Sequence, residues 1–183
     1  MKPVALIAAA AALLLLAACN TTPSLEARTD YKQDYDFSGV AKIAIQPVRR
    51  ANLEAVRISD MQVSRLNNAF RDALQARGMK VVDDNAKADL LMTWHLVTEE
   101  RTDVRTYNTS SFYNCWRCGP TMSDVSVRQY TQGTLIVDMI DPQSLRSVWR
   151  SIVQTRLRQS NEEQAAALRK EAARASFAEF PPP

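Results

Sequence analysis

Three long stretches of the sequence alternate apolar and polar residues, and this alternation limits the fold more than any other feature. They cover residues 90–99, 125–140 and 147–157. In the last stretch, Trp149, Val153 and Leu157 share one face, while Arg150 falls on the other. Period-two patterning is typical of strands that pack on one side and face water on the other, as in antiparallel sheets. We therefore expect Trp149 in the core and Arg150 at the solvent surface.

Two helices are predicted by N-terminal capping boxes, in which a cap side chain and a residue three positions later satisfy each other's backbone amides. The boxes are Ser59-x-x-Gln62 and Ser160-x-x-Glu163. Apolar residues then recur at helical spacing, and Gly78 stands where a left-handed C-terminal cap belongs. Strands and helices together predict an α+β fold. It is a two-layer sandwich with a mainly antiparallel sheet and two helices packed on one face.

The N-terminal segment has the three-part organisation of a secretory signal peptide, with Lys2 ahead of an apolar run over residues 4–18. The run is about 15 residues long, shorter than the roughly 20 that a membrane-spanning helix needs. Its ending, Leu16-Ala17-Ala18-Cys19, resembles the bacterial lipobox, in which the cysteine is acylated and becomes the first mature residue. The resemblance implies lipidation of Cys19. With Asn20 next rather than Asp, it implies an outer-membrane anchor that faces the periplasm.

Beyond residues 1–18, the sequence predicts one tethered domain. Residues 19–30 read as a flexible tether, residues 31–180 as a single α+β domain, and residues 181–183 as a proline tail. The formal net charge of +3 becomes +2 once Lys2 is removed with the signal peptide. So balanced a charge argues against a nucleic-acid partner.

Five segments in order resemble the bacterial envelope lipoproteins grouped as a domain-of-unknown-function family, DUF4136. They are Tyr35-Asp36-Phe37-Ser38-Gly39, Ala88-Asp89-Leu90-Leu91-Met92, Gly133-Thr134-Leu135-Ile136-Val137-Asp138, Val148-Trp149-Arg150 and Phe180-Pro181-Pro182. The resemblance implies an envelope location and a compact α+β fold. It carries over no catalytic residue.

Cys115 and Cys118 both lie in the exported domain, where oxidation is permitted. A redox-active pair belongs at the start of a helix, whose dipole lowers the pKa of the thiol. Here turn-forming residues flank the pair on both sides. We therefore expect a structural disulfide between Cys115 and Cys118, with a redox pair as the alternative.

Other candidate groups are sparse, and we expect no catalytic residue, cofactor or metal ion. His95 is the single histidine and falls on the polar face of its strand. Neither a nucleophile elbow nor a second pair of zinc ligands accompanies it. Acidic residues cluster near the ends of the long strands, where paired carboxylates would suit a hydrolase of envelope glycan or lipid. They are Glu99, Glu100, Asp103 and Asp124.

The sequence favours a membrane-anchored periplasmic binding or scaffold module over an enzyme. Its partners would be the membrane, through the acyl chains of Cys19, and an envelope protein or glycan. The hydrolase remains open, as does an apolar-ligand carrier, which would need a cavity lined by Trp94, Trp149 and Met139. Such a hydrolase would gather its acids in a concave pocket, whereas a binding module would spread them over the sheet.

Overall fold

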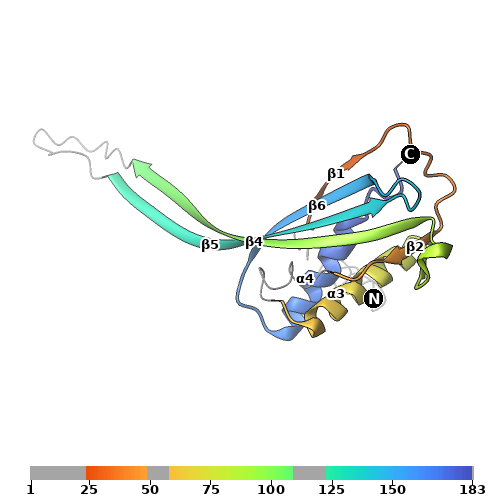
Figure 1. Ribbon diagram of the computed structural model, residues 1–183. Helices are drawn as coiled ribbons and strands as arrows, with labels where there is room; N and C mark the ends of the chain where they lie inside the picture. The colour runs from red at the N-terminus through yellow and green to blue at the C-terminus, as the bar shows by residue number, and fades with distance from the viewer. Residues whose placement is uncertain (1–23, 49–57, 109–122, 183) are drawn as a thin grey trace, which may run out of the picture.

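The computed structural model describes residues 24–48, 58–108 and 123–182, with the side chains of 106–108 and 123–125 left undescribed. Six strands form one sheet in the order β1-β6-β5-β4-β2-β3, and α3 and α4 lie together on one side of it (Figure 1). The strands are β1 (Ala27–Tyr31), β2 (Lys42–Ile45), β3 (Lys80–Val82), β4 (Leu90–Asn108), β5 (Ser123–Ile140) and β6 (Ser147–Leu157). The helices are α3 (Asp60–Ala76), the short 3-10 helix η2 (Asn85–Lys87) and α4 (Glu162–Ser176).

The sheet is mixed, so the predicted α+β class is confirmed and the mainly antiparallel sandwich only in part. β1–β6, β6–β5 and β5–β4 are antiparallel, whereas β2 pairs in parallel with both β3 and β4. The chain returns from β2 to the sheet through α3, and a helical crossover of this kind is what parallel neighbours require.

The helix boundaries follow their capping residues. Both hydrogen bonds of the Ser59–Gln62 box form at the start of α3, and Gly78 takes a φ of 82° just beyond its end. α4 begins one residue later than predicted, because Asn161 caps the helix and Gln164 completes the box. An asparagine oxygen is as good an N-cap acceptor as a serine hydroxyl, and the sequence offered both.

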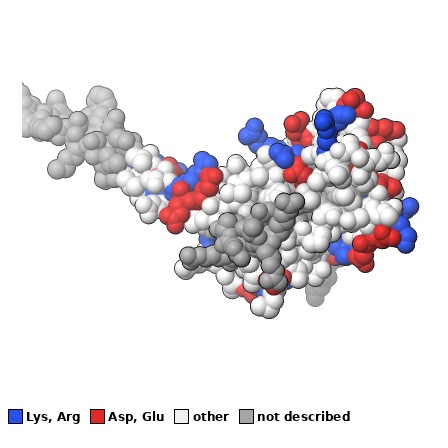
Figure 2. Space-filling model, in the orientation of Figure 1, with Lys and Arg blue, Asp and Glu red and all other residues white. Residues whose placement is uncertain are grey.

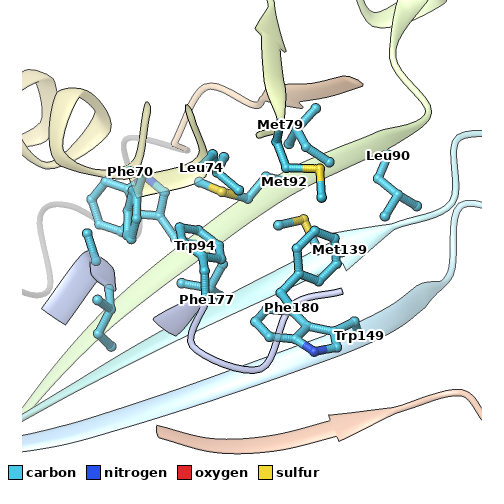
Figure 3. Packing of buried hydrophobic residues seen from close by; sticks show 14 of the residues in the cluster. Phe70, Leu74, Met79, Leu90, Met92, Trp94, Met139, Trp149, Phe177 and Phe180 are labelled. Atoms are coloured by element: carbon cyan, nitrogen blue, oxygen red, sulfur yellow. The ribbon is translucent and has the colours of Figure 1, made fainter. Parts of the chain in front are cut away.

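Aromatic side chains fill the core between the sheet and the helices (Figure 3). Trp94 and Trp149 are 2% and 1% exposed, which confirms that they face the core. Phe177 and Phe180 follow the end of α4 and are fully buried, and the Phe180 ring lies 5.0 Å from that of Trp149. The indole nitrogen of Trp94 donates to Asn67 Oδ1 at 2.8 Å, which satisfies its buried N–H.

β1 begins at Ala27, four residues before the expected start of the domain. Its five residues pair with β6 from Ala27 opposite Val153 to Tyr31 opposite Trp149. The first described residue is Ser24, so the part of the expected tether outside the described residues is 19–23.

Arg150 is not the independent surface residue that alternation predicts. Its guanidinium donates from Nε to Asp138 Oδ1 at 2.7 Å and from Nη2 to Oδ2 at 3.1 Å. Asp138 is only 4% exposed, although alternation placed it on the wet face. The hydrogen bonds and charge of Asp138 raise the pKa of Arg150. The predicted parity of Asp138 and Arg150 was right. The polar face of the sheet is covered at Asp138, however, because Arg150 and Ser147 both lie over its carboxylate.

Candidate interaction surface on a two-stranded arm

The most prominent feature outside the core is a ribbon formed by β4 and β5 where they outrun the sheet. These strands pair from Leu91 opposite Ile140 to Asn108 opposite Ser123. β6 accompanies β5 only as far as Thr131, and β2 accompanies β4 only as far as Met92. Residues 101–108 and 123–130 therefore form a two-stranded projection, which we call the arm. Figure 1 shows it curving away from the body in green and teal.

At the base of the arm, the side chain of Leu157 lies close to the backbone of Gly133 on the helix side of the sheet. A Cβ at Gly133 would lie 3.1 Å from the nearest side-chain carbons of Leu157. Leu157 is the last residue of β6, so its side chain covers the point where the third strand ends. Glycine at this position lets Leu157 lie against the backbone of β5.

One face of the arm carries charges that pair with one another. Arg101 Nη2 lies 3.0 Å from Glu99 Oε2, and Arg105 Nε lies 3.5 Å from Asp103 Oδ2. Arg156, at the end of β6, reaches Asp103 Oδ2 at 3.7 Å and stacks 4.0 Å from the centre of the Tyr130 ring. Blue and red side chains accordingly lie side by side on the arm in Figure 2. Because these side chains are largely exposed, each pair contributes about 0–1 kcal/mol at most.

The opposite face of the arm continues the core-facing side of the sheet past the two helices. Val104 and Val127 stand directly opposite each other in the β4–β5 register, and they are 58% and 59% exposed. Thr102 and Gln129 form the neighbouring pair towards the body. An exposed valine pair on an uncharged ribbon face is suited to contact with another protein, because its burial would remove apolar area from water.

The acidic residues proposed for a hydrolase are spread along the β4–β5 ladder. Glu99 pairs with Gln132 and Asp103 with Arg128, whereas Asp124 stands opposite Tyr107, eight positions from Glu99. That separation is about 27 Å at the usual rise per residue. Glu100 has the opposite parity to Glu99 and Asp103, so it belongs to the other face. Five hollows among the described residues are all lined by other side chains.

His95 lines a hollow of about 350 Å³ beside the end of β2, together with Thr93, Pro47 and Ile140. It has an interaction partner within the molecule. No group of three metal-ligating side chains occurs among the described residues. Among the described residues, His95 therefore belongs to no set of three side chains that could hold a metal ion.

The residues proposed for an apolar-ligand cavity fill the core instead of lining a space. Met139 is fully buried with Trp94 and Trp149, and the rings of Trp149 and Phe177 stack at 6.3 Å (Figure 3). Cys19, Cys115 and Cys118 lie outside the described residues, so their lipidation and pairing stay predictions. In the part of the chain that the structure describes, no helix has the length and apolarity to cross a bilayer.

Sequence reasoning missed the part of the arm that belongs to β4, residues 101–108, whereas the alternating stretch 125–140 already included most of the part that belongs to β5. Val104 is the only aliphatic residue in 101–108, so no apolar period marks how far β4 runs. The available signal was the run of β-favouring residues on either side of the segment 109–122, including Thr102, Val104, Thr106 and Val127.

Comparison with solved structures places the fold among bacterial proteins. A PDZ domain protein from Parabacteroides distasonis matches with a TM-score of 0.52 and 13% identity over 87% of this chain, which spans 37% of that protein. A DUF4136 family protein from Bacteroides thetaiotaomicron matches with a TM-score of 0.49 and 16% identity, covering 86% of this chain and 96% of its own. The PelC dodecamer from Paraburkholderia phytofirmans matches with a TM-score of 0.48 and 10% identity, covering 84% of this chain and 95% of its own. At these identities the first match shows the fold alone.

A search of curated proteins found no match. The family model described as "Domain of unknown function (DUF4136)" matches residues 27–182, from the first residue of β1 to the penultimate residue of the chain. The match spans the six strands and the two α-helices that the structure describes, in agreement with the resemblance of the five sequence segments. The chain therefore belongs to the DUF4136 family.

Proposed function

We propose that this protein is a membrane-anchored periplasmic lipoprotein that acts as an envelope binding or scaffold module, with the arm as its partner-binding element. The anchor would be the acyl chains of Cys19, in the outer membrane. A single acyl chain binds a bilayer only marginally, whereas several together give stable anchoring. The sequence from Lys2 to Cys19 supports this part of the proposal.

The observation that carries the binding role is the arm itself. An isolated two-stranded hairpin is marginally stable in water. None of the described core residues lies in the arm, so the core contributes little to keeping it ordered. A partner that covers the Val104–Val127 face would supply the missing packing. It could also pair with the arm's outer backbone edges, which none of the other described strands occupies.

The proposal is tested by photo-crosslinking in living cells. A photoreactive amino acid at Val104 or Val127 should give crosslinked products of defined mass, because both side chains face outward on the arm. The matched control is Leu145, which is 73% exposed in the turn at the opposite end of β5 and β6. Crosslinks from the arm and none from Leu145 support the proposal. Absence of crosslinks from both arm positions, with the protein folded and abundant, would overturn it.

The anchor has a separate test. Intact-mass analysis of the protein purified from membranes should give a mature chain that begins at Cys19 and carries acyl chains. Cys19→Ala should leave the protein unprocessed or release it from the membrane. An N-terminus other than Cys19, or a mature mass without acyl chains, would contradict the anchor while leaving the arm's role untouched.

A further inference from the structure

The chain enters the sheet beside the second half of β6. Ala27 pairs with Val153, which lies four residues before the last residue of that strand. Upstream of Ala27, Leu25 lines one hollow with Thr155, and its backbone N–H donates to Glu171 Oε1 at 3.3 Å. These contacts fix where the tether meets the body.

That entry point lies near the middle of the molecule's long axis. Thr155 pairs with Gly133 of β5, and Gly133 pairs with Thr98 of β4. The β4–β5 ladder extends from Leu91 at one end to Asn108 at the other. From the level of the entry point, the ladder therefore runs ten residues, about 33 Å, along the arm and seven residues, about 23 Å, along the body.

The tether is too short to span either half of the ladder. Four residues separate Cys19 from Ser24, the first described residue, so five Cα–Cα steps join the two. Fully extended, they reach about 18 Å. If the arm pointed straight at the bilayer, its tip would hold Ser24 about 33 Å away from the surface. If the arm pointed straight away, the body would hold Ser24 off by about 23 Å, which is also more than the tether can reach.

We infer that the long axis of the β4–β5 ladder is not upright but tilted to within about 50° of the plane of the bilayer, so that the arm reaches sideways to a protein held in the same membrane. This inference rests on the proposed anchor at Cys19. It narrows the partner of the arm to a membrane-embedded or membrane-anchored protein. The uncharged Val104–Val127 face and the self-paired charges of the opposite face are both compatible with a protein neighbour.

The orientation is tested by comparing the heights of the two ends of the molecule above a membrane. The acylated protein is added to vesicles of phosphatidylethanolamine and phosphatidylglycerol that contain an acceptor-labelled lipid. A donor dye is attached through a non-natural amino acid at Val127 on the arm, or at Leu145 at the far end. Because the tether keeps the entry point of the chain within about 18 Å of the surface, energy transfer should be measurable from both positions, although one end can stand higher than the other. Efficient transfer from one end and none from the other, as for an upright molecule, would overturn the inference.

A lengthened tether is the matched control. Insertion of twenty Gly and Ser residues between Pro23 and Ser24 keeps the anchor and the domain but removes the restriction on height. Energy transfer should then fall at both labelled positions, and crosslinks from Val104 in cells should weaken. Unchanged transfer and crosslinking in this variant would show that tether length does not set the orientation. Failure of the unmodified protein to float with vesicles would overturn the anchor and the orientation together, whereas flotation with energy transfer from one end alone would overturn the orientation alone.

Discussion

Trp149 is one of the largest fully buried side chains of the core. It is 1% exposed, and its ring contacts those of Phe177 and Phe180. Trp149→Ala should lower the free energy of unfolding by about 3–5 kcal/mol, because it removes a large apolar side chain and leaves a cavity. Urea unfolding followed by far-UV circular dichroism measures the loss. A change below 1 kcal/mol would show that the core closes around the deletion.

Arg150 stabilises the protein through its ion pair with Asp138, whose carboxylate is nearly buried. The Arg150 side chain is 52% exposed, but that of Asp138 is only 6% exposed. Arg150→Ala should cost about 1–3 kcal/mol, because it leaves a buried carboxylate without its charged donor. Arg158→Ala, at an exposed position just past the end of β6, should change stability by less than about 0.5 kcal/mol. Equal urea midpoints for the two variants would contradict this role of the ion pair.

Asp141 organises the turn between β5 and β6 by accepting hydrogen bonds from Ser144. Its Oδ2 lies 2.6 Å from Ser144 Oγ and 2.9 Å from the Ser144 amide nitrogen. These bonds hold the pKa of Asp141 below its usual value of 3.8. A lowered folded-state pKa stabilises the fold above the unfolded value, and that contribution is lost as the pH falls through the folded-state pKa. In carboxyl NMR titrations, Ser144→Ala should move the pKa of Asp141 up towards 3.8, and no such rise would contradict the assignment.

At the scale of elements, the N-terminus of α4 has two candidate capping residues, Ser160 and Asn161. Asn161 Oδ1 accepts from the Gln164 amide at 2.9 Å, whereas the sequence pattern had assigned the cap to Ser160. Asn161→Ala should therefore cost about 1 kcal/mol, as for the loss of an N-cap. Ser160→Ala should have little effect. Thermal unfolding of both variants decides between them, and a larger loss for Ser160→Ala would restore the pattern's assignment.

Sequence patterning predicted the elements that pack against the core with a single face or are capped by residues near in sequence. The bounds predicted for β6, residues 147–157, are those observed, because Trp149 and Val153 alternate with polar residues against a single core. The same logic located the start of α3, where Ser59 and Gln62 cap each other locally. These features depend on neighbours in sequence or on a single packed face, so one chain is enough to reveal them.

Features that depend on distant partners could not be predicted in this way. β1 is an edge strand with an arginine and an aspartate among its five residues, so its composition resembles that of a tether. The parallel pairing of β2 leaves no mark in its four residues. Burial of Asp138 depends on Arg150 from the neighbouring strand. The extent of the arm depends on where β6 ends, which the sequences of β4 and β5 do not record.

At the scale of the whole molecule, the body contains the described core, whereas the arm carries the proposed binding role. The described core residues belong to the two helices, to the sheet outside the arm and to the segments that flank them, and Leu96 and Leu135 are the last members towards the arm. The arm extends the molecule along its strands without adding to this core. A long, thin element of this kind suits the proposed sideways contact better than it suits a catalytic cleft, because a two-stranded ribbon cannot enclose a substrate.

The division predicts that the arm can be removed without unfolding the body. Glu100 and Thr131 are opposite each other in the ladder, so replacing residues 101–130 with Asn-Gly would close a two-residue hairpin. The urea midpoint should stay close to that of the intact protein, because no described core residue is deleted. If the arm binds a partner, its removal should abolish partner binding in cells. If the arm has no binding role, its removal should leave partner binding unchanged. Co-purification of partners from crosslinked envelopes should therefore fail for this variant, while flotation with membranes is preserved. A large drop in midpoint would show that the arm stabilises the body, and unchanged partner recovery would place the binding surface elsewhere.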